Sequence, residues 1–323
     1  MGLQALARLS ARASVSRISY DRSMVPVSGR LTLWLTAWLC VVASGVQADD
    51  RNPCVTPQVA VSSTVATAYL PAKTGTVNVA SLNMAGQGRI ADALTAWLEE
   101  RTVDVLLLQE VGQVSTDGRV FAAELAARLG FAFAFASSIP YENGHSQGLA
   151  ILSRYPLEDV SVHPLTHFRL RFRSRCRIAL AATVRTANGP LRLANVHLDT
   201  RINSGNRVAQ LGPALDALGP FDGPRLIGGD FNTMNVRWLR SMWPLPYLQR
   251  QSGAVRTMMS SHGFDTPFTD TPATFRFLGL PLKLDWLYLK DLKPLEWGVD
   301  RIEFTDHRGV WAHLQRDDVE AGP

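Results

Sequence analysis

The chain has 323 residues, of which 46% are hydrophobic and 19% are charged, and its mean hydropathy is zero. This composition excludes a disordered, collagen-like or multi-span membrane protein and is typical of a globular enzyme. The net charge of +5 and the pI of about 9.4 favour an anionic partner such as nucleic acid. The distribution of the charges weakens that inference, because residues 1–48 alone carry five arginines against one aspartate.

The first 48 residues have the three parts of a secretory signal peptide. A basic segment precedes an apolar run of 16 residues over Leu31–Val46, shorter than the ~20 residues of a comfortable membrane span. Ala48 then stands before two aspartates, which predicts cleavage after Ala48. Met24 is an alternative start that gives a more usual signal length. We expect export to the periplasm or the medium, with an uncleaved anchor or a buried helix as the alternatives.

From Thr76 onward the pattern predicts alternating strands and helices. Helices are expected at Ile90–Glu100 and Gly118–Leu129. Buried strands are expected at Val77–Leu82, Val103–Gln109, Phe131–Phe135, Gly148–Leu152, Arg175–Val184, Leu191–Leu198, Pro224–Ile227, Lys283–Leu289 and Gly309–His313. We expect an extended lead-in over 49–75, a single domain over 76–316 and a tail over 317–323. The pattern favours an α/β protein with a large mixed or antiparallel sheet content.

Polar side chains stand where these apolar strands end. They are Asn83, Glu110, His197 with Asp199, Asp230 with Asn232, Asp285, and Asp306 with His307. Because alternate residues of a strand face the same side, the members of the two i, i+2 pairs project together. Each group alone is also explained as a solvated strand end or a turn. Their shared placement indicates a single site.

The residue types of this set suit one kind of chemistry. Carboxylates with asparagine match the oxygen ligands that Mg²⁺ prefers, and the absence of Cys-x₂-Cys spacing argues against structural zinc. Histidines beside carboxylates suit negative charge on a phosphoryl oxygen. An aspartate beside an asparagine suits the orientation and deprotonation of a water molecule. The pattern therefore predicts metal-assisted hydrolysis of a phosphoester.

Seven short motifs resemble, in order, those of the endonuclease/exonuclease/phosphatase superfamily, which includes DNase I, abasic-site endonucleases, secreted sphingomyelinases and inositol-phosphate phosphatases. They are Ser81-Leu82-Asn83, Leu108-Gln109-Glu110-Val111, the segment 148–153, the segment 195–199, Gly229-Asp230-Phe231-Asn232, Leu284-Asp285-Trp286 and Thr305-Asp306-His307-Arg308. Together they span about residues 76–314. One departure is Ala85, where abasic-site endonucleases place an aspartate, and it argues against a dedicated abasic-site repair enzyme.

The resemblance implies a DNase I-like four-layer α/β sandwich, in which two central mixed or antiparallel sheets are flanked by helices. It also implies a Mg²⁺ cofactor, with Mn²⁺ or Ca²⁺ as alternatives. Glu110 would be the principal metal ligand, supported by Asn83 and Asp306.

The catalytic roles implied by the resemblance fall on five residues. His197 and His307 would contact the scissile phosphate, and Asp285 would orient His307. Asp230 would orient or deprotonate the water molecule. Asn232 would hold the phosphate or that water.

Five arginines occupy alternate positions in the segment 167–177, which leads into the apolar stretch Ile178–Val184. They are Arg169, Arg171, Arg173, Arg175 and Arg177. As a strand, this segment presents a row of guanidiniums that suits a polyanionic substrate, or else a solvated edge protected by charge. We expect Arg177 to lie nearest the site and, with Asp199, to bind substrate. The same alternation would turn Cys176 toward the core and so argues against a disulfide with Cys54. The spacing of the cysteines alone does not decide whether the pair forms.

Three functions remain after these observations. The first is an exported Mg²⁺-dependent phosphodiesterase acting on nucleic acid, slightly favoured by the arginine row. The second applies the same chemistry to a phospholipid, as in a sphingomyelinase, or to an inositol phosphate or other small phosphate ester. The third is a non-catalytic binding module. The Trp- and Pro-rich stretch Arg237–Tyr247 is either a substrate-facing loop or a packed helix cap. We expect a monomer without a stable protein partner.

Overall fold

The computed structural model describes Cys54, Pro57 and residues 59–62, 75–86, 92–113, 120–140, 146–171, 174–277 and 279–317. All of these residues belong to one compact unit that begins at Gly45. The expected signal peptide and the last six residues of the tail lie outside the described residues. Within the described part of the chain, no helix is both long enough and apolar enough to cross a membrane.

The described residues form two large sheets and two small hairpins. The first sheet has the strand order β1-β4-β5-β3-β2-β16-β15, with β1 (Val59–Ser62), β2 (Thr76–Asn83), β3 (Val105–Gln113), β4 (Ala132–Pro140), β5 (Ser146–Ser153), β15 (Leu292–Arg301) and β16 (Arg308–Arg316). The second sheet has the order β14-β9-β8-β7-β6, with β6 (Leu157–Pro164), β7 (Ile178–Thr186), β8 (Gly189–His197), β9 (Arg225–Asp230) and β14 (Asp285–Lys290). The hairpins pair β10 (Val236–Leu239) with β11 (Trp243–Pro246) and β12 (Phe275–Phe277) with β13 (Leu280–Leu282).

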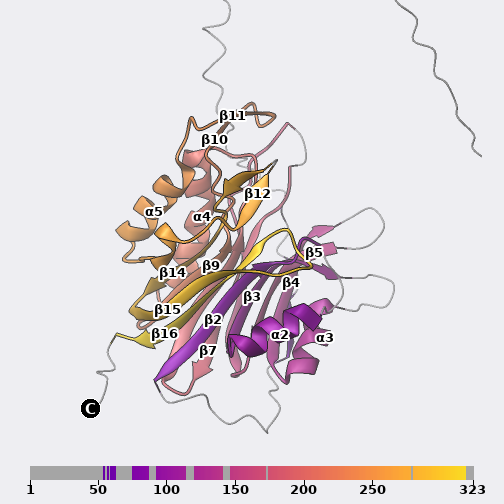
Figure 1. The fold of residues 1–323 in the computed structure, drawn as a ribbon, viewed down its shortest axis with the longest axis vertical. Coiled ribbons are helices and arrows are strands. Elements are labelled where there is room, and N and C mark those ends of the chain that lie inside the picture. The colour runs from indigo at the N-terminus through magenta and orange to yellow at the C-terminus, as the bar shows by residue number, and fades with distance from the viewer. Residues whose placement is uncertain are drawn as a thin grey trace, which may run out of the picture. The chain divides into compact units, whose positions relative to one another are not determined.

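Helices cover the outer faces of both sheets (Figure 1). The pair α2 (Asp92–Glu100) and α3 (Phe121–Leu129) packs on the first sheet, whereas α4 (Ser204–Leu218) and α5 (Gln251–Ser261) lie on the second. A short 3₁₀ helix, η2, spans Pro267–Asp270. The inner faces of the two sheets pack against each other. The layers are therefore helix, sheet, sheet and helix, which is the expected DNase I-like α/β sandwich.

Strand β3 shows how the sequence builds these layers. Val105 and Leu107 face the second sheet, whereas Leu106 and Leu108 face α2 and α3. Since alternate residues of a strand point to opposite faces and both faces are buried, the strand reads as one continuous apolar run. The pattern that predicted the strand also places the side chain of Gln109 between the sheets.

Each sheet contains one β-α-β unit. In the first, β2 and β3 are parallel and α2 connects them; in the second, β8 and β9 are parallel and α4 connects them. The other strand pairs of the two sheets are antiparallel. Because crossovers bring the carboxyl ends of parallel strands to one edge, the polar residues that follow these four strands are gathered there.

The expected arginine row is wrong, because its described residues do not form a strand. Strand β7 begins only at Ile178, and the described residues 165–171 and 174–177 are irregular. Arg169 and Arg171 are exposed, Arg175 is half-buried and Arg177 is buried. Alternation of side chains holds only for an extended backbone, so the inference of one basic face fails. Arg173 lies outside the described residues.

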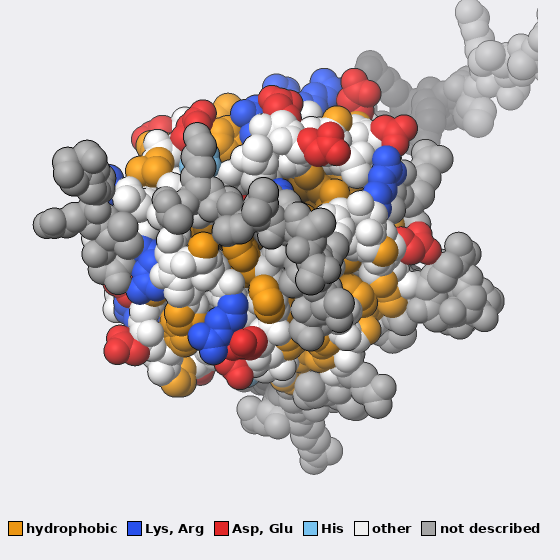
Figure 2. Space-filling model, turned by 90° about the horizontal axis from the view of Figure 1, so that it is seen from below, with side chains coloured by type: hydrophobic (Ala, Val, Ile, Leu, Met, Phe, Trp, Pro, Cys, Tyr) orange, Lys and Arg blue, Asp and Glu red, His pale blue; other side chains and the backbone are white. Residues whose placement is uncertain are grey.

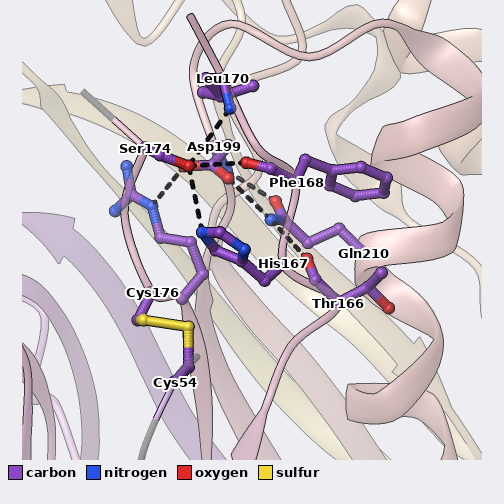
Figure 3. The surroundings of a disulfide bond; sticks show 10 residues. Cys54, Thr166, His167, Phe168, Leu170, Ser174, Cys176, Asp199 and Gln210 are labelled. Atoms are coloured by element: carbon purple, nitrogen blue, oxygen red, sulfur yellow. Dashed lines mark hydrogen bonds and ion pairs between the residues drawn. A yellow bond between two sulfur atoms is a disulfide. The ribbon is translucent and has the colours of Figure 1, made fainter. Parts of the chain in front are cut away.

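Cys54 and Cys176 form a disulfide, with 5.4 Å between their Cα atoms (Figure 3). A regular strand would have turned Cys176 into the core and away from Cys54. In the irregular segment the residue is half-buried instead and reaches the lead-in. The bond joins residues 122 positions apart and fixes the lead-in beside the segment that carries Arg177.

Candidate active site

The carboxylate of Asp230 lies at the point where the two sheets meet. It is 2% exposed at the end of β9. Its Oδ2 accepts a hydrogen bond from Asn83 Nδ2 at 3.0 Å and lies 3.5 Å from His197 Nε2 and 4.0 Å from His307 Nε2. Its Oδ1 accepts from the backbone N–H of Asn232 at 2.8 Å. Three strand ends and the loop before β16 therefore converge on one carboxylate.

The glycine before Asp230 allows this close approach. Gly229 has φ +136°, and a Cβ on it would lie 2.0 Å from the carbonyl oxygen of Val196 on β8. Only a residue without a side chain fits this backbone and this neighbour. The pair Gly228-Gly229 thus lets β9 run beside β8 and turn Asp230 toward the neighbouring sheet.

Glu110 reaches the site through a bulge in β3. The pairing of β3 with β5 shifts register between Leu108 and Val111, and Glu110 has φ +53°. A bulge redirects a side chain that regular pleating would place elsewhere. Its Oε1 lies 3.4 Å from Asn83 Nδ2 and 3.8 Å from His197 Nε2, and its side chain is 28% exposed. Glu110 is thus more exposed than the carboxylates of Asp230 and Asp285.

His307 and Asp285 form a buried hydrogen-bonded pair. His307 Nδ1 lies 2.9 Å from Asp285 Oδ2, and Asp285 is the register partner of Asp230 across β14 and β9. Burial by itself lowers the pKa of His307, but the charge and hydrogen bond of Asp285, with the charges of Asp230 and Asp306, outweigh it and raise that pKa to about 10. His307 is therefore a cation at neutral pH.

His197 has the opposite protonation state. Burial, and then the positive charges of Arg177 and His307, hold the pKa of His197 well below its usual value. Burial also raises the pKa of Asp230 to about 7; the charge of Asp285 adds to this rise, and His307, Asn232 and Asn83 oppose it. The site thus combines a neutral imidazole, an imidazolium and a carboxyl group that titrates near neutral pH. Groups whose pKa values are driven apart in this way are typical of acid and base pairs.

The remaining predicted residues lie around this centre. Asn232 is buried, and its Nδ2 donates to the carbonyl oxygen of Leu198 at 2.9 Å. Asp306 is exposed next to His307. The neighbouring Thr305 donates from Oγ1 to the carbonyl oxygen of Asn83 at 2.8 Å, which fixes this loop at the end of β2.

Asp199 is enclosed by protein rather than open to substrate. Arg177 Nε donates to its Oδ1 at 3.0 Å, and Gln210 Nε2 donates to its Oδ2 at 2.9 Å. Both side chains of the Arg177–Asp199 ion pair are less than 5% exposed. Figure 3 shows the hydrogen bond between Asp199 and Gln210 in the surroundings of the disulfide. The ion pair therefore holds Arg177 against Asp199, which stands two residues beyond His197 in the chain.

Two groups of buried polar residues support the site although no pattern in the sequence assigns them a role. Arg207 of α4 donates to the carbonyl oxygens of Asp199 and Phe231, each at 2.7 Å, and so joins the loops after β8 and β9. Gln109 and Asn195 bond between the sheets, with Nε2 of Gln109 2.8 Å from Oδ1 of Asn195. Gln109 lies in the same sequence motif as Glu110, and Asn195 lies in the same motif as His197. These shared motifs are the sequence feature from which a supporting role could have been predicted.

Two sets of side chains could hold a metal ion. Asp230, Asp285 and His307 have ligand atoms within 4.8 Å of one another. Nδ1 of His307 is bonded to Asp285, however, and a protonated imidazole has no lone pair for a metal. The side chains of Asn83, Glu110 and Asp306 carry oxygen donors, and Glu110 and Asp306 reach solvent. Asn83 turns Nδ2 toward Glu110 and its Oδ1 accepts from the N–H of Ala85 at 2.9 Å, so its amide would have to turn to give an oxygen to an ion beside Glu110. This second set fits a hard cation such as Mg²⁺ better.

Comparison with models of protein families identifies the family of this chain. The model of the Endonuclease/Exonuclease/phosphatase family matches residues 76–307, so the chain belongs to this family. Members of the family are phosphoesterases. No curated protein sequence matches the chain.

Solved structures share the fold at low sequence identity. An endonuclease/exonuclease/phosphatase from Beutenbergia cavernae DSM 12333 matches with 18% identity and a TM-score of 0.58, over 77% of this chain and 73% of its own. The human Nocturnin catalytic domain with a bound sulfate anion matches with 18% identity and a TM-score of 0.55, over 75% of this chain and 94% of its own. D. rerio TDP2 complexed with a single-strand DNA product matches with 16% identity and a TM-score of 0.51, over 74% and 99%. At these identities the likeness shows the fold.

Proposed function

We propose that this protein is an exported, Mg²⁺-dependent hydrolase of phosphodiesters. The observation that carries the proposal is the position of Asp230, whose carboxylate is fixed by Asn83 and Asn232 and flanked by His197 and His307. A carboxylate held on both oxygens has one orientation, which a group that must align an attacking water requires.

Asp230 acts as the general base. Its pKa of about 7 allows it to be ionised at neutral pH and still to accept a proton from water. Asn83 and Asn232 donate to its two oxygens and set the direction from which the water is held. The water oxygen bonds to phosphorus as the bond from phosphorus to the leaving oxygen breaks. The proton released by the water moves to Asp230, and the leaving oxygen takes a proton from solvent.

The two histidines bind the phosphate and its developing charge. His307, kept protonated by Asp285, donates from Nε2 to a phosphoryl oxygen and stabilises the negative charge that grows there. Neutral His197 is placed to donate a hydrogen bond to a second oxygen. Both rings lie on the same carboxylate, so the phosphate is held beside the water that Asp230 activates.

Glu110 is the principal ligand of the metal in this proposal, and Asn83 and Asp306 complete the set. The bound ion would supply Lewis-acid polarisation of a phosphoryl oxygen. The partial exposure of Glu110 leaves its carboxylate accessible to an ion that keeps several waters, as Mg²⁺ does.

The substrate class and the location are part of the proposal. No arginine strand supports a nucleic acid substrate, but Arg169 and Arg171 are exposed in the part of the chain that leads to Arg177. Nucleic acid therefore remains one candidate beside phospholipids and small phosphate esters. The disulfide supports export, because such bonds persist in oxidising compartments.

A substrate panel tests the proposal. The purified protein is incubated with plasmid DNA, RNA, sphingomyelin, phosphoinositides and a small chromogenic phosphodiester, each with Mg²⁺ and with EDTA. We expect hydrolysis of at least one phosphodiester with Mg²⁺ and none with EDTA. Asp230→Asn and His307→Ala should each lower kcat by about 10²–10⁴-fold. Hydrolysis that survives both substitutions, or its absence from the wild type on every substrate, would refute the mechanism.

A further inference from the structure

Two hairpins expose large apolar side chains at the border of the site. Among the described residues they carry, in the hairpin or directly after it, Met242, Trp243, Leu245, Tyr247, Leu248, Phe277 and Leu280. Trp243 is 65% exposed and Tyr247 71%. Single exposed apolar residues are common on soluble proteins, but such a concentration marks a surface that meets a partner.

The charge of these segments has one sign. Residues 236–250 contain Arg237, Arg240 and Arg250, residues 275–283 contain Arg276 and Lys283, and neither segment contains an acidic residue. By contrast, the face of the molecule seen from below in Figure 2 carries acidic and basic side chains close together. Exposed apolar side chains combined with basic ones are complementary to a surface that is both apolar and negatively charged.

Hairpin β10–β11 is bonded to residues at the starts of α4 and α5, and hairpin β12–β13 contacts the site residue His307. Asn203 Nδ2 donates to the carbonyl oxygen of Trp238 at 2.9 Å and its Oδ1 accepts from the Trp238 N–H at 2.7 Å. Gln251 Nε2 donates to the carbonyl oxygen of Val236 at 2.9 Å. On the other side, the ring of Phe275 in β12 packs 4.8 Å from that of His307. Figure 1 shows β10, β11 and β12 near the top, away from β15.

We propose that hairpins β10–β11 and β12–β13 dock this protein on an anionic phospholipid surface, with the catalytic edge of the sheets turned toward the lipid. Trp and Tyr favour the boundary between headgroups and acyl chains, and arginines bind the anionic headgroups. Leu245, Leu248 and Met242 have no ring on which a base could stack, so the composition favours lipid over a nucleic acid strand.

Vesicle co-sedimentation of the purified protein tests the docking without any measurement of hydrolysis. The vesicles contain phosphatidylcholine alone or an equal mixture of phosphatidylcholine and phosphatidylserine. We expect binding to the mixed vesicles that weakens with salt. The triple variant Trp243→Ser/Tyr247→Ser/Leu248→Ser should bind at least about tenfold more weakly, since each replaced side chain loses apolar burial. Arg240→Gln and Arg250→Gln should each cost about fivefold.

A matched control uses exposed apolar residues on the edge strand β15. Leu295→Ser/Trp297→Ser removes side chains that are 47% and 42% exposed, and it should keep wild-type binding. Unchanged thermal midpoints of the variants establish that they fold. The proposal is overturned if the wild type binds neither vesicle, or if the β15 variant loses as much binding as the triple variant. It is also overturned if the triple variant loses binding to single-stranded DNA, or a self-association seen by light scattering, and keeps its vesicle binding.

Discussion

Asn83 Nδ2 lies 3.0 Å from Asp230 Oδ2, and this hydrogen bond joins the end of β2 in the first sheet to the end of β9 in the second. The two residues are 147 positions apart in the chain. Each ends a strand of a β-α-β unit, so the bond couples the corresponding edges of the two sheets. A change in how the sheets pack therefore alters the orientation of the carboxylate that we assign as the base.

Removal of this bond should impair catalysis more than stability. In Asn83→Ala we expect kcat on a small phosphodiester to fall by about 10²-fold, because a small misplacement of a reacting group has effects of this size. The measurement is steady-state kinetics at saturating Mg²⁺, with the thermal midpoint as the control for folding. An Asn83→Ala enzyme with wild-type kcat would contradict the positioning of Asp230 by Asn83.

Glu110 should determine the Mg²⁺ concentration that the enzyme needs for activity. In Glu110→Gln we expect the Mg²⁺ concentration for half-maximal activity to rise by about 100-fold or more, since even the partners of metal ligands contribute 10–100-fold to metal affinity. Glu99→Gln, at an exposed carboxylate on α2, is the matched control and should leave the requirement unchanged. Isothermal titration with Mg²⁺ gives a readout that does not depend on turnover. A changed requirement in Asp285→Asn, but not in Glu110→Gln, would assign the ion to the Asp230, Asp285 and His307 cluster instead.

In the metal-free protein the pKa values of the two site histidines should be shifted in opposite directions. With the pKa of His307 near 10 and that of His197 well below normal, NMR in EDTA should show His307 protonated and His197 neutral from pH 6.5 to 8.5. In Asp285→Asn the pKa of His307 should fall, because the charge that raises it is gone. Two histidines that both titrate near pH 6.5 would contradict this assignment.

Stability should follow the same shifts. The raised pKa of His307 stabilises the fold fully below about pH 6.5, and this contribution is lost as the pH rises toward 10. The depressed pKa of His197 acts in reverse: below about pH 6.5 the unfolded chain takes up a proton that the buried ring does not, so stability falls. Between pH 5.5 and 6.5 the effect of His197 is opposed by Asp230, because its raised pKa of about 7 lowers stability as the pH rises. Urea unfolding in EDTA at pH 6.5 and 9.5 should therefore give the larger free energy of unfolding at pH 6.5. The alkaline decrease should be smaller in Asp285→Asn.

The disulfide should contribute stability through the loop that it closes. We expect Cys54→Ser to lose about 2–5 kcal/mol, because the bond restricts a long loop of the unfolded chain. Dithiothreitol should lower the thermal midpoint of the wild type to that of the variant and leave the variant unaffected. Equal midpoints of the oxidised wild type and the variant would show that the bond does not stabilise the fold.

Gln109 and Asn195 should contribute to stability as an energetically coupled pair. Gln109→Leu leaves the buried Oδ1 of Asn195 without this donor, and we expect a loss of about 1–3 kcal/mol. The double variant Gln109→Leu/Asn195→Leu should lose less than the sum of the two single variants, because each single change already breaks the shared bond. Additive losses in urea unfolding would show that the two side chains do not interact.

The sequence could predict the strands that carry the site because they are buried on both faces. The run Val105–Leu108 identifies β3, and the polar residue that ends each such strand identifies a candidate ligand or catalytic group. It did not predict α4, because Gly205, Gly212 and Pro213 lower the helix propensity of that segment. Packing of its buried face against the second sheet outweighs that cost.

The sequence by itself determined the family, the sandwich fold and the identity of the polar residues at the strand ends, because local burial and short motifs encode them. Tertiary structure alone decided which of those residues meet, that Cys54 bonds with Cys176, and that the arginine segment is irregular. It also set the protonation states of His197 and His307, since these depend on burial and on charges supplied by distant parts of the chain. The physical reason is that contacts between residues more than a hundred positions apart follow from the packing of two sheets, which no local pattern specifies.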